Sequence, residues 1–401
     1  MILTIGKDKT RKHTYIFLIA LYLFALACLY SDEHIRLYYA IVCTEFIWAF
    51  LKVIISKYRI NLVANSSFIW WVLCVFLMYL SVGILRTTYA LFSVYYIAMH
   101  LMNTLTIVFF LIDLSLEDIE EILCKGSAWG SVFSMVFVVV NEFDIIRHGS
   151  ERIGVSASGN VDVFGMYLGI MSIFCLFKII VRQNRGYMPV YALQVGFMLL
   201  TGSKQALLYI IISYLMFIKY KYKRNLSKYF LPFLVIVGLG IAIFTVPVLY
   251  ELVGHRILIM LVSFGINING IESSYSTDKR IAMITIALQL FKDHPLFGGG
   301  WGYFTHFSGF GVYSHTTYTE ILVTYGLFGF VLYYFYFYKR LIVCALKQKR
   351  SEMEQLVFVL LCSIVVADIA RITFSQTSLN YVIAFISWKV LRDTKKSRCL
   401  S

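Results

Sequence analysis

The sequence predicts an all-α polytopic membrane protein with about 12 transmembrane helices. Of its 401 residues, 60% are hydrophobic and only 14% are charged, and the mean hydropathy is +0.76. A soluble domain is about half apolar and a quarter charged, so this chain has more apolar surface than one soluble core can bury. The same composition excludes a disordered chain, a collagen and a coiled coil.

Long apolar stretches give the predicted spans, because a spanning helix needs about 20 mostly apolar residues. The seventh and eighth spans are short and share a tight connection at 201–204, which predicts a helical hairpin. The spans are expected at 14–30, 37–55, 67–85, 89–111, 126–142, 161–179, 187–201, 204–218, 229–249, 317–338, 354–370 and 378–391.

The N-terminal span follows four basic residues, as in a signal peptide. These residues are Lys7, Lys9, Arg11 and Lys12. The apolar run at 15–30 is long enough to cross a membrane, and further spans follow it. We therefore expect a retained first helix, with cleavage as the alternative.

The distribution of charge predicts the orientation. With a cytoplasmic N-terminus and an even number of spans, all but ten of the 36 lysines and arginines fall on the cytoplasmic side, as the positive-inside rule requires. Both termini are then cytoplasmic. The net charge of +14 follows from this rule, and no basic stripe accompanies a foldable module that would bind nucleic acid.

Motifs for the common cofactors are missing from the sequence. The eight cysteines are scattered, without metal or redox spacing, and most lie in apolar runs. The sequence also lacks the zinc-binding, phosphate-loop, dinucleotide-binding and serine-hydrolase patterns. We expect neither a metal nor another cofactor.

One connection is much longer than the others. Within a single integral membrane domain at 1–401, a large extracytoplasmic loop is expected at 250–316, between the ninth and tenth helices. Its segment Arg280–Lys292 has the character of a short amphipathic helix, either at the membrane surface or re-entrant, which ends before Pro295. The glycine-rich segment Gly298–Gly302 predicts a flexible turn.

The outward cations are informative because the orientation rule does not require them. Arg152, Lys204 and Arg280 come from three outer loops. Arginine binds phosphate oxygens bidentately, so these residues are candidates for binding a lipid-linked diphosphate. The alternative for each is snorkelling or local ion pairing. Arg371 follows Asp368 by three residues, which predicts a structural pair on one helix.

A histidine and a glutamate lie at the start of the tenth helix. His315 is placed for proton transfer, because an unperturbed imidazole titrates near neutrality; a solvent-facing loop histidine is the alternative. Thr317 and Glu320 have the spacing of a capping box. Glu320 is alternatively a residue that orients His315 or an acceptor sugar.

Taken in order, four segments resemble the O-antigen ligase and Wzy-type polysaccharide polymerase superfamily. They are Glu151–Asn160 (ERIGVSASGN), Thr201–Leu207 (TGSKQAL), Lys279–Phe304 and His315–Gly329 (HTTYTEILVTYGLFG). The sequence departs from the family pattern at Lys204, where arginine is usual, and at Thr316, where asparagine is common. The serine or threonine form at this second position resembles polymerases more than ligases.

The resemblance implies a GT-C-like, metal-independent glycosyltransferase in the bacterial cytoplasmic membrane. Its substrates would be polyprenyl-diphosphate-linked oligosaccharides at the outer face, with membrane lipid, a flippase and a chain-length regulator as partners. In this hypothesis Arg280, Arg152 and Lys204 bind the diphosphate. His315 and Glu320 are the catalytic candidates: His315 accepts the proton of the attacking hydroxyl, or orients that sugar together with Glu320.

Two alternatives stay open. An O-antigen ligase would use a lipid-core acceptor in place of another repeat unit. A transporter or lipid-linked oligosaccharide flippase would place its ionisable residues near the membrane midplane, where Glu45 and His100 are the main candidates.

Overall fold

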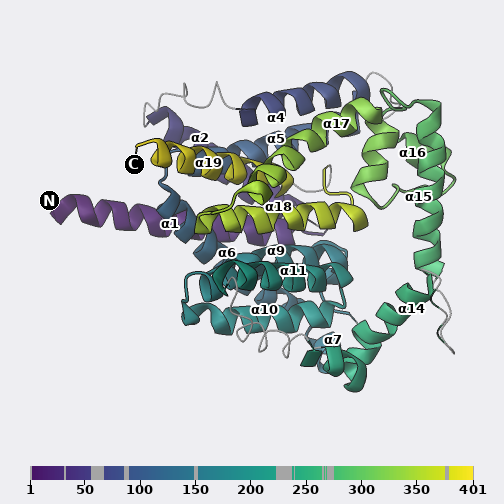
Figure 1. Ribbon diagram of the computed structural model, residues 1–401, viewed down its shortest axis with the longest axis horizontal. Coiled ribbons are helices and arrows are strands. Elements are labelled where there is room, and N and C mark those ends of the chain that lie inside the picture. The colour runs from purple at the N-terminus through teal and green to yellow at the C-terminus, as the bar shows by residue number, and fades with distance from the viewer. Residues whose placement is uncertain are drawn as a thin grey trace. The chain divides into compact units, whose positions relative to one another are not determined.

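The computed structural model shows a helical protein (Figure 1). It describes residues 2–30, 33–55, 67–84, 90–148, 152–222, 237–238, 240–263, 266, 268, 275–374 and 379–400. Every regular element in these residues is a helix, which confirms the predicted all-α class. Five described segments are long and apolar enough to cross a membrane: Arg11–Cys28, Ile35–Ile54, Leu116–Asn141, Val161–Ile180 and Thr317–Leu346.

These helices and the composition identify a multi-pass membrane protein. The count of twelve spans and the placement of the long loop stay predictions, and the span expected at 229–249 lies partly outside the described residues. The chain forms two compact units, which are described separately. Unit 1 holds residues 1–47 and 113–271, and unit 2 holds residues 48–112 and 272–401.

Unit 1 is assembled around α9 (Val161–Ile180), which packs on three of its neighbours, α6, α10 and α11. The predicted hairpin is present as α10 and α11, which are joined through Gly202 in a left-handed cap. Besides α9, unit 1 contains α1 (Ile2–Cys28), the first part of α2 (Ile35–Ile55), α6 (Leu116–Asn141), α7 (Phe143–His148), α8 (Val155–Ser158), η2 (Arg185–Tyr187), α10 (Met188–Thr201), α11 (Lys204–Tyr222), α13 (Pro247–Leu249), η3 (Tyr250–Gly254) and α14 (His255–Ser263).

Small residues bring α1 and α6 close together. A Cβ atom on Gly126 would lie 2.6 Å from the Ile19 side chain, and one on Gly130 would lie 3.0 Å from the Ala20 carbonyl oxygen. The two glycines are four residues apart and therefore share one face of α6. This spacing is typical of membrane helices whose backbones approach closely.

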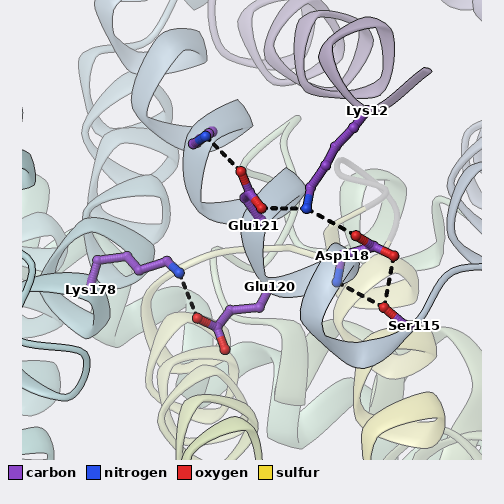
Figure 2. A network of polar contacts seen from close by, with 7 residues as sticks. Lys12, Ser115, Asp118, Glu120, Glu121 and Lys178 are labelled. Carbon is purple, nitrogen blue, oxygen red and sulfur yellow. Dashed lines mark hydrogen bonds and ion pairs between the residues drawn. The ribbon is translucent and has the colours of Figure 1, made fainter. Parts of the chain in front are cut away.

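A polar network surrounds the first turns of α6 (Figure 2). Ser115 caps the helix, with its hydroxyl accepting from the Asp118 N–H at 3.1 Å. Lys12 forms ion pairs with Asp118, at 3.0 Å, and with Glu121. The network thereby joins the N-terminal helix α1 to α6.

Glu120 lies on the buried side of this turn. Its side chain is 6% exposed, and it pairs with Lys178 at 2.6 Å and with Arg182. Lys178 lies in the last turn of α9 and Arg182 lies two residues beyond its end, so one carboxylate ties α6 to the end of α9.

Removing this carboxylate charge is expected to destabilise unit 1. Glu120→Gln leaves two cations without their buried partner, and the free energy of unfolding should fall by about 2–3 kcal/mol. This decrease should be smaller than that for a fully buried ion pair, because the Arg182 side chain is 38% exposed. Thermal unfolding in detergent measures the effect. The matched control is Glu117→Gln, an exposed position on the same helix; equal melting temperatures for the two variants would contradict the prediction.

Unit 2 is built on α17, which packs against α4, α15 and α18. An aromatic core lies between α4, α17 and α19: Trp71 stacks on Tyr336 with 4.6 Å between ring centroids, and its indole N–H donates to the Tyr333 carbonyl oxygen. The helices of unit 2 are α4 (Ser67–Met78), η1 (Tyr79–Ile84), α5 (Ala90–Leu111), α15 (Tyr275–Asp293), α16 (Tyr303–Phe307), α17 (Thr317–Leu346), α18 (Glu352–Ala370) and α19 (Leu379–Leu400).

The helix predicted over Arg280–Lys292 lies within α15, which begins five residues earlier. One face of α15 is buried in unit 2. Met283 and Ala287 form a small core with Phe304 of α16 and Val323 of α17. This packing fixes the helix that carries Arg280 beside the start of α17 (Figure 1).

Helix α17 is broken at Gly326, where φ is 68° and ψ is −167°. A neighbouring loop satisfies the backbone groups that the break exposes. The N–H groups of Gly299 and Gly300 donate to the carbonyl oxygens of Val323 and Thr324, at 2.8 and 3.0 Å. In return, the N–H groups of the two residues after Gly326 donate to the carbonyl oxygens of residues 295 and 296, at 2.8 and 3.0 Å.

This arrangement corrects the prediction of a flexible turn at Gly298–Gly302. The start of that segment is held against α17 by hydrogen bonds. A Cβ atom on Gly298 would lie 2.3 Å from the Thr324 backbone. Glycine is required at this position because two backbones touch.

Candidate functional site

The predicted site residues are divided between the two units. Arg152 and Lys204 belong to unit 1, whereas Arg280, His315 and Glu320 belong to unit 2. The structure brings the unit 2 residues together around the start of α17.

The N-terminus of α17 is capped one residue earlier than predicted. Thr316 is the N-cap, and its hydroxyl accepts from the Thr319 N–H at 3.1 Å. The expected capping box of Thr317 and Glu320 is therefore wrong. The Thr317 hydroxyl instead donates to the Arg371 carbonyl oxygen at 2.6 Å.

Glu320 is buried, and it fixes the segment that precedes the helix. Its carboxylate accepts from the Ser314 N–H at 2.8 Å. The Ser314 hydroxyl is also hydrogen-bonded to the Thr319 hydroxyl at 2.9 Å. Because His315 lies between Ser314 and Thr316, these contacts hold both sides of the histidine.

His315 has a left-handed backbone, with φ at 62°. Such a conformation is uncommon outside glycine, although histidine, asparagine and aspartate adopt it more often than other residues. Backbone strain of this kind is frequent at functional sites. The imidazole packs near the Tyr313 ring, with 4.7 Å between centroids.

Three cations act on the His315 imidazole. Burial is the largest cause of a pKa lowered from 6.5 to about 4. The positive charges of Arg280, Arg371 and Lys279 lower this pKa further. The low pKa keeps the imidazole unprotonated near neutrality, so it can accept a proton, although as a weaker base than a free imidazole. The nearby positive charges suit an anionic ligand.

The two α15 cations differ in their surroundings. The Lys279 ammonium lies 5.7 Å from the centre of the Phe310 ring. The Arg280 side chain is exposed, so its guanidinium is accessible to a ligand from solvent or from the membrane surface.

Arg371 is the site residue that sequence reasoning missed. The predicted helical pair with Asp368 is wrong, because α18 ends at Ala370 and Arg371 is extended. Asp368 instead accepts hydrogen bonds from the hydroxyls of Tyr334, at 2.8 Å, and Thr373. The Thr317 contacts hold the Arg371 backbone beside the start of α17, and its charge acts on His315.

In unit 1, Arg152 takes part in local structure. Its guanidinium pairs with Asp162 at 2.5 Å and donates to the Thr201 carbonyl oxygen at 2.5 Å. The arginine therefore joins the start of α9 to the end of α10. Lys204 is the first residue of α11, and its side chain lies outside the described part of the structure.

Glu142 adds a contact that the sequence did not indicate. Its carboxylate accepts from the N–H groups of Gly154 and Ser156, at 2.6 and 2.5 Å. The two bonds fix the loop that carries Arg152. Within the described residues, no three histidine, cysteine, aspartate or glutamate side chains gather as a metal site would need.

The fold and this site define a class: a multi-pass helical membrane protein with a histidine at the start of a helix, on which three cationic side chains act. Residues 189–334 match the family model described as O-antigen ligase, a segment that includes α15 and the start of α17. The match confirms the resemblance of the chain to the O-antigen ligase and polymerase superfamily. No curated protein matches the chain.

Proposed function

We propose that the protein is a polysaccharide polymerase, a membrane glycosyltransferase that extends lipid-linked glycans. The observation that carries the proposal is the position of His315 at the start of α17, where its left-handed backbone is held between the contacts of Ser314 and Thr316. The positive charges of Arg280, Arg371 and Lys279 act on its imidazole. The donor would be a polyprenyl-diphosphate-linked glycan and the acceptor another lipid-linked repeat unit. Reaction at the outer face of the bacterial cytoplasmic membrane, with both termini inside, is part of the proposal.

The chemistry uses one base and one anion site. His315 accepts the proton of the acceptor hydroxyl while the oxygen of that hydroxyl bonds to the anomeric carbon of the donor. The bond from that carbon to the diphosphate oxygen breaks, and the electron pair leaves with the polyprenyl diphosphate. Arg280 and Lys279 stabilise the released negative charge. The sugar diphosphate supplies the driving force, so the reaction needs no nucleotide.

The remaining predicted residues have supporting roles in this proposal. Glu320 is a positioning residue, since its carboxylate binds the Ser314 backbone beside the histidine. Arg152 and Lys204 remain proposed diphosphate ligands, but Arg152 already pairs with Asp162. The proposal therefore rests on the unit 2 residues.

The test is transfer by the purified full-length chain. It would receive only a polyprenyl-diphosphate repeat unit, with chelator and without nucleotide, and products would be separated on a gel. A ladder of multiples supports the polymerase. The family description favours the ligase reaction as the second candidate, and a single transfer to an added lipid-core acceptor would establish it. Folded protein that is silent with both acceptors would overturn transfer and favour transport.

The acid limb of the pH profile is expected near pH 4. Because the pKa of His315 is lowered to about 4, the imidazole stays neutral and can accept a proton from neutrality down to that pH. The kcat/KM, which reports the free enzyme, should be flat from pH 7 to about 5 and fall as pH approaches 4. Arg280→Gln removes one cause of the low pKa, so its normalised limb should move toward 6.5. A wild-type limb near 6.5 would contradict the assignment.

A further inference from the structure

Unit 2 contains a groove of about 1140 Å³ between α4, α17 and α19. Its two ends differ in chemistry. One end is apolar and includes Trp70, Cys74, Phe328 and Val331. The other end is basic.

Five cations line the basic end: Lys339, Arg340, Lys347, Arg392 and Lys395. Two of them have carboxylate partners, since Lys347 pairs with Glu354 at 2.5 Å and Arg392 pairs with Asp393 at 2.7 Å. For the other three, no carboxylate of the described residues lies within ion-pair distance. The groove therefore carries an excess of positive charge where its apolar wall ends.

Aromatic rings hold the guanidinium groups in place. The Arg340 guanidinium lies 4.3 Å from the centre of the Tyr336 ring, and the Arg392 guanidinium lies 4.4 Å from that of Trp388. Stacking of this kind leaves the N–H edges of arginine available for an anion.

The Arg340 guanidinium is anchored at the basic end of the groove. One terminal nitrogen donates to the Ser67 hydroxyl at 3.0 Å. The Nε atom is buried, so an anion in the groove would meet the terminal N–H groups of this guanidinium.

We propose that the groove binds an anionic phospholipid of the bilayer. The phosphate accepts hydrogen bonds from Arg340 and is neutralised by Lys339 and Lys395, while the acyl chains lie along Trp70 and Val331. Free phosphate would leave the apolar wall unused, and a neutral lipid would leave the cations unpaired. The assignment is independent of the proposed transfer reaction. It also agrees with the predicted cytoplasmic side, where anionic lipids attract basic residues.

The test compares two lipids with identical acyl chains on the purified, delipidated full-length chain. Native mass spectrometry would measure the binding of phosphatidylglycerol and phosphatidylcholine, with inorganic phosphate as competitor. Phosphatidylglycerol is expected to bind at least about tenfold more tightly, because each nearby cation contributes about fivefold. Equal binding of the two lipids, or complete competition by millimolar phosphate, would overturn the proposal.

Two variants test separately how the cations and the apolar end of the groove contribute to lipid binding. Lys339→Gln with Arg340→Gln should weaken phosphatidylglycerol binding about tenfold to thirtyfold, whereas the control Lys292→Gln, an exposed position outside the groove, should leave it unchanged. Cys74→Trp fills the exposed apolar end and keeps every cation, so it should also reduce binding. This second variant does not depend on the folding of the first. Unchanged binding in Cys74→Trp would contradict the groove as the site.

Discussion

His315→Asn is expected to lower the rate of glycan transfer by about 10²–10⁴-fold, which is the usual contribution of a proton acceptor. Asparagine adopts left-handed backbone more readily than most residues, so it is suited to the φ of 62° at this position. Its amide cannot take up the proton of the attacking hydroxyl. The loss should therefore appear in single-turnover rates while the melting temperature in detergent stays that of the wild type.

The control for this variant is the same substitution at His306. That histidine is exposed on α16 and packs against Phe307 at 4.8 Å between ring centroids. His306→Asn is expected to keep wild-type transfer. If His315→Asn retained a rate within a few-fold of wild type, His315 would not be the proton acceptor, and the neighbouring cations would remain as an anion site alone.

The sequence was sufficient for the class of protein and for many of its helices. Apolar stretches of about 20 residues predict helices with little help from distant contacts, and α9 and α18 begin within two residues of their predicted starts. Helix α6 shows the limit of this argument. Its first turns carry Asp118, Glu120 and Glu121, which composition excludes from a span, although in the structure they are paired with lysine and arginine.

Details of the site depended on contacts between distant segments. Two adjacent threonines make the cap of α17 ambiguous by one residue, and the Arg371 carbonyl oxygen, 54 residues further on, engages Thr317. The spacing of Arg371 and Asp368 predicts a helical pair, because spacing alone does not show where α18 ends. The isoleucine and threonine that follow Arg371 favour extended structure, and they were the signal that could have marked this end.

The break in α17 was also hidden from the sequence. Apolar residues continue on both sides of Gly326, so the pattern is that of one uninterrupted helix. Glycine alone inside a helix is tolerated. Only the loop at 295–300, which comes from elsewhere in the chain, supplies the hydrogen bonds that make the break stable.

Gly326→Ala is expected to destabilise the protein by about 3–5 kcal/mol. The backbone conformation at this position is almost exclusive to glycine and costs other residues about 1–3 kcal/mol. A Cβ atom would also lie 2.4 Å from the Leu296 backbone, and moving that segment disturbs hydrogen bonds worth about 1 kcal/mol each. Thermal unfolding in detergent measures the loss, together with the yield of folded protein.

The matched control is Gly196→Ala, which places the same methyl group on a helical glycine of α10 with no atom within 4 Å. This change should be neutral or slightly stabilising, since alanine favours helix more than glycine does. Equal stability of the two variants would contradict the role assigned to the break. The break also has a consequence for function. The loop bound at Gly326 connects α15 to α16 and is hydrogen-bonded to α17, so it helps to fix Arg280 relative to His315. The fraction of Gly326→Ala protein that folds should therefore transfer glycan more slowly than the same amount of folded wild-type protein.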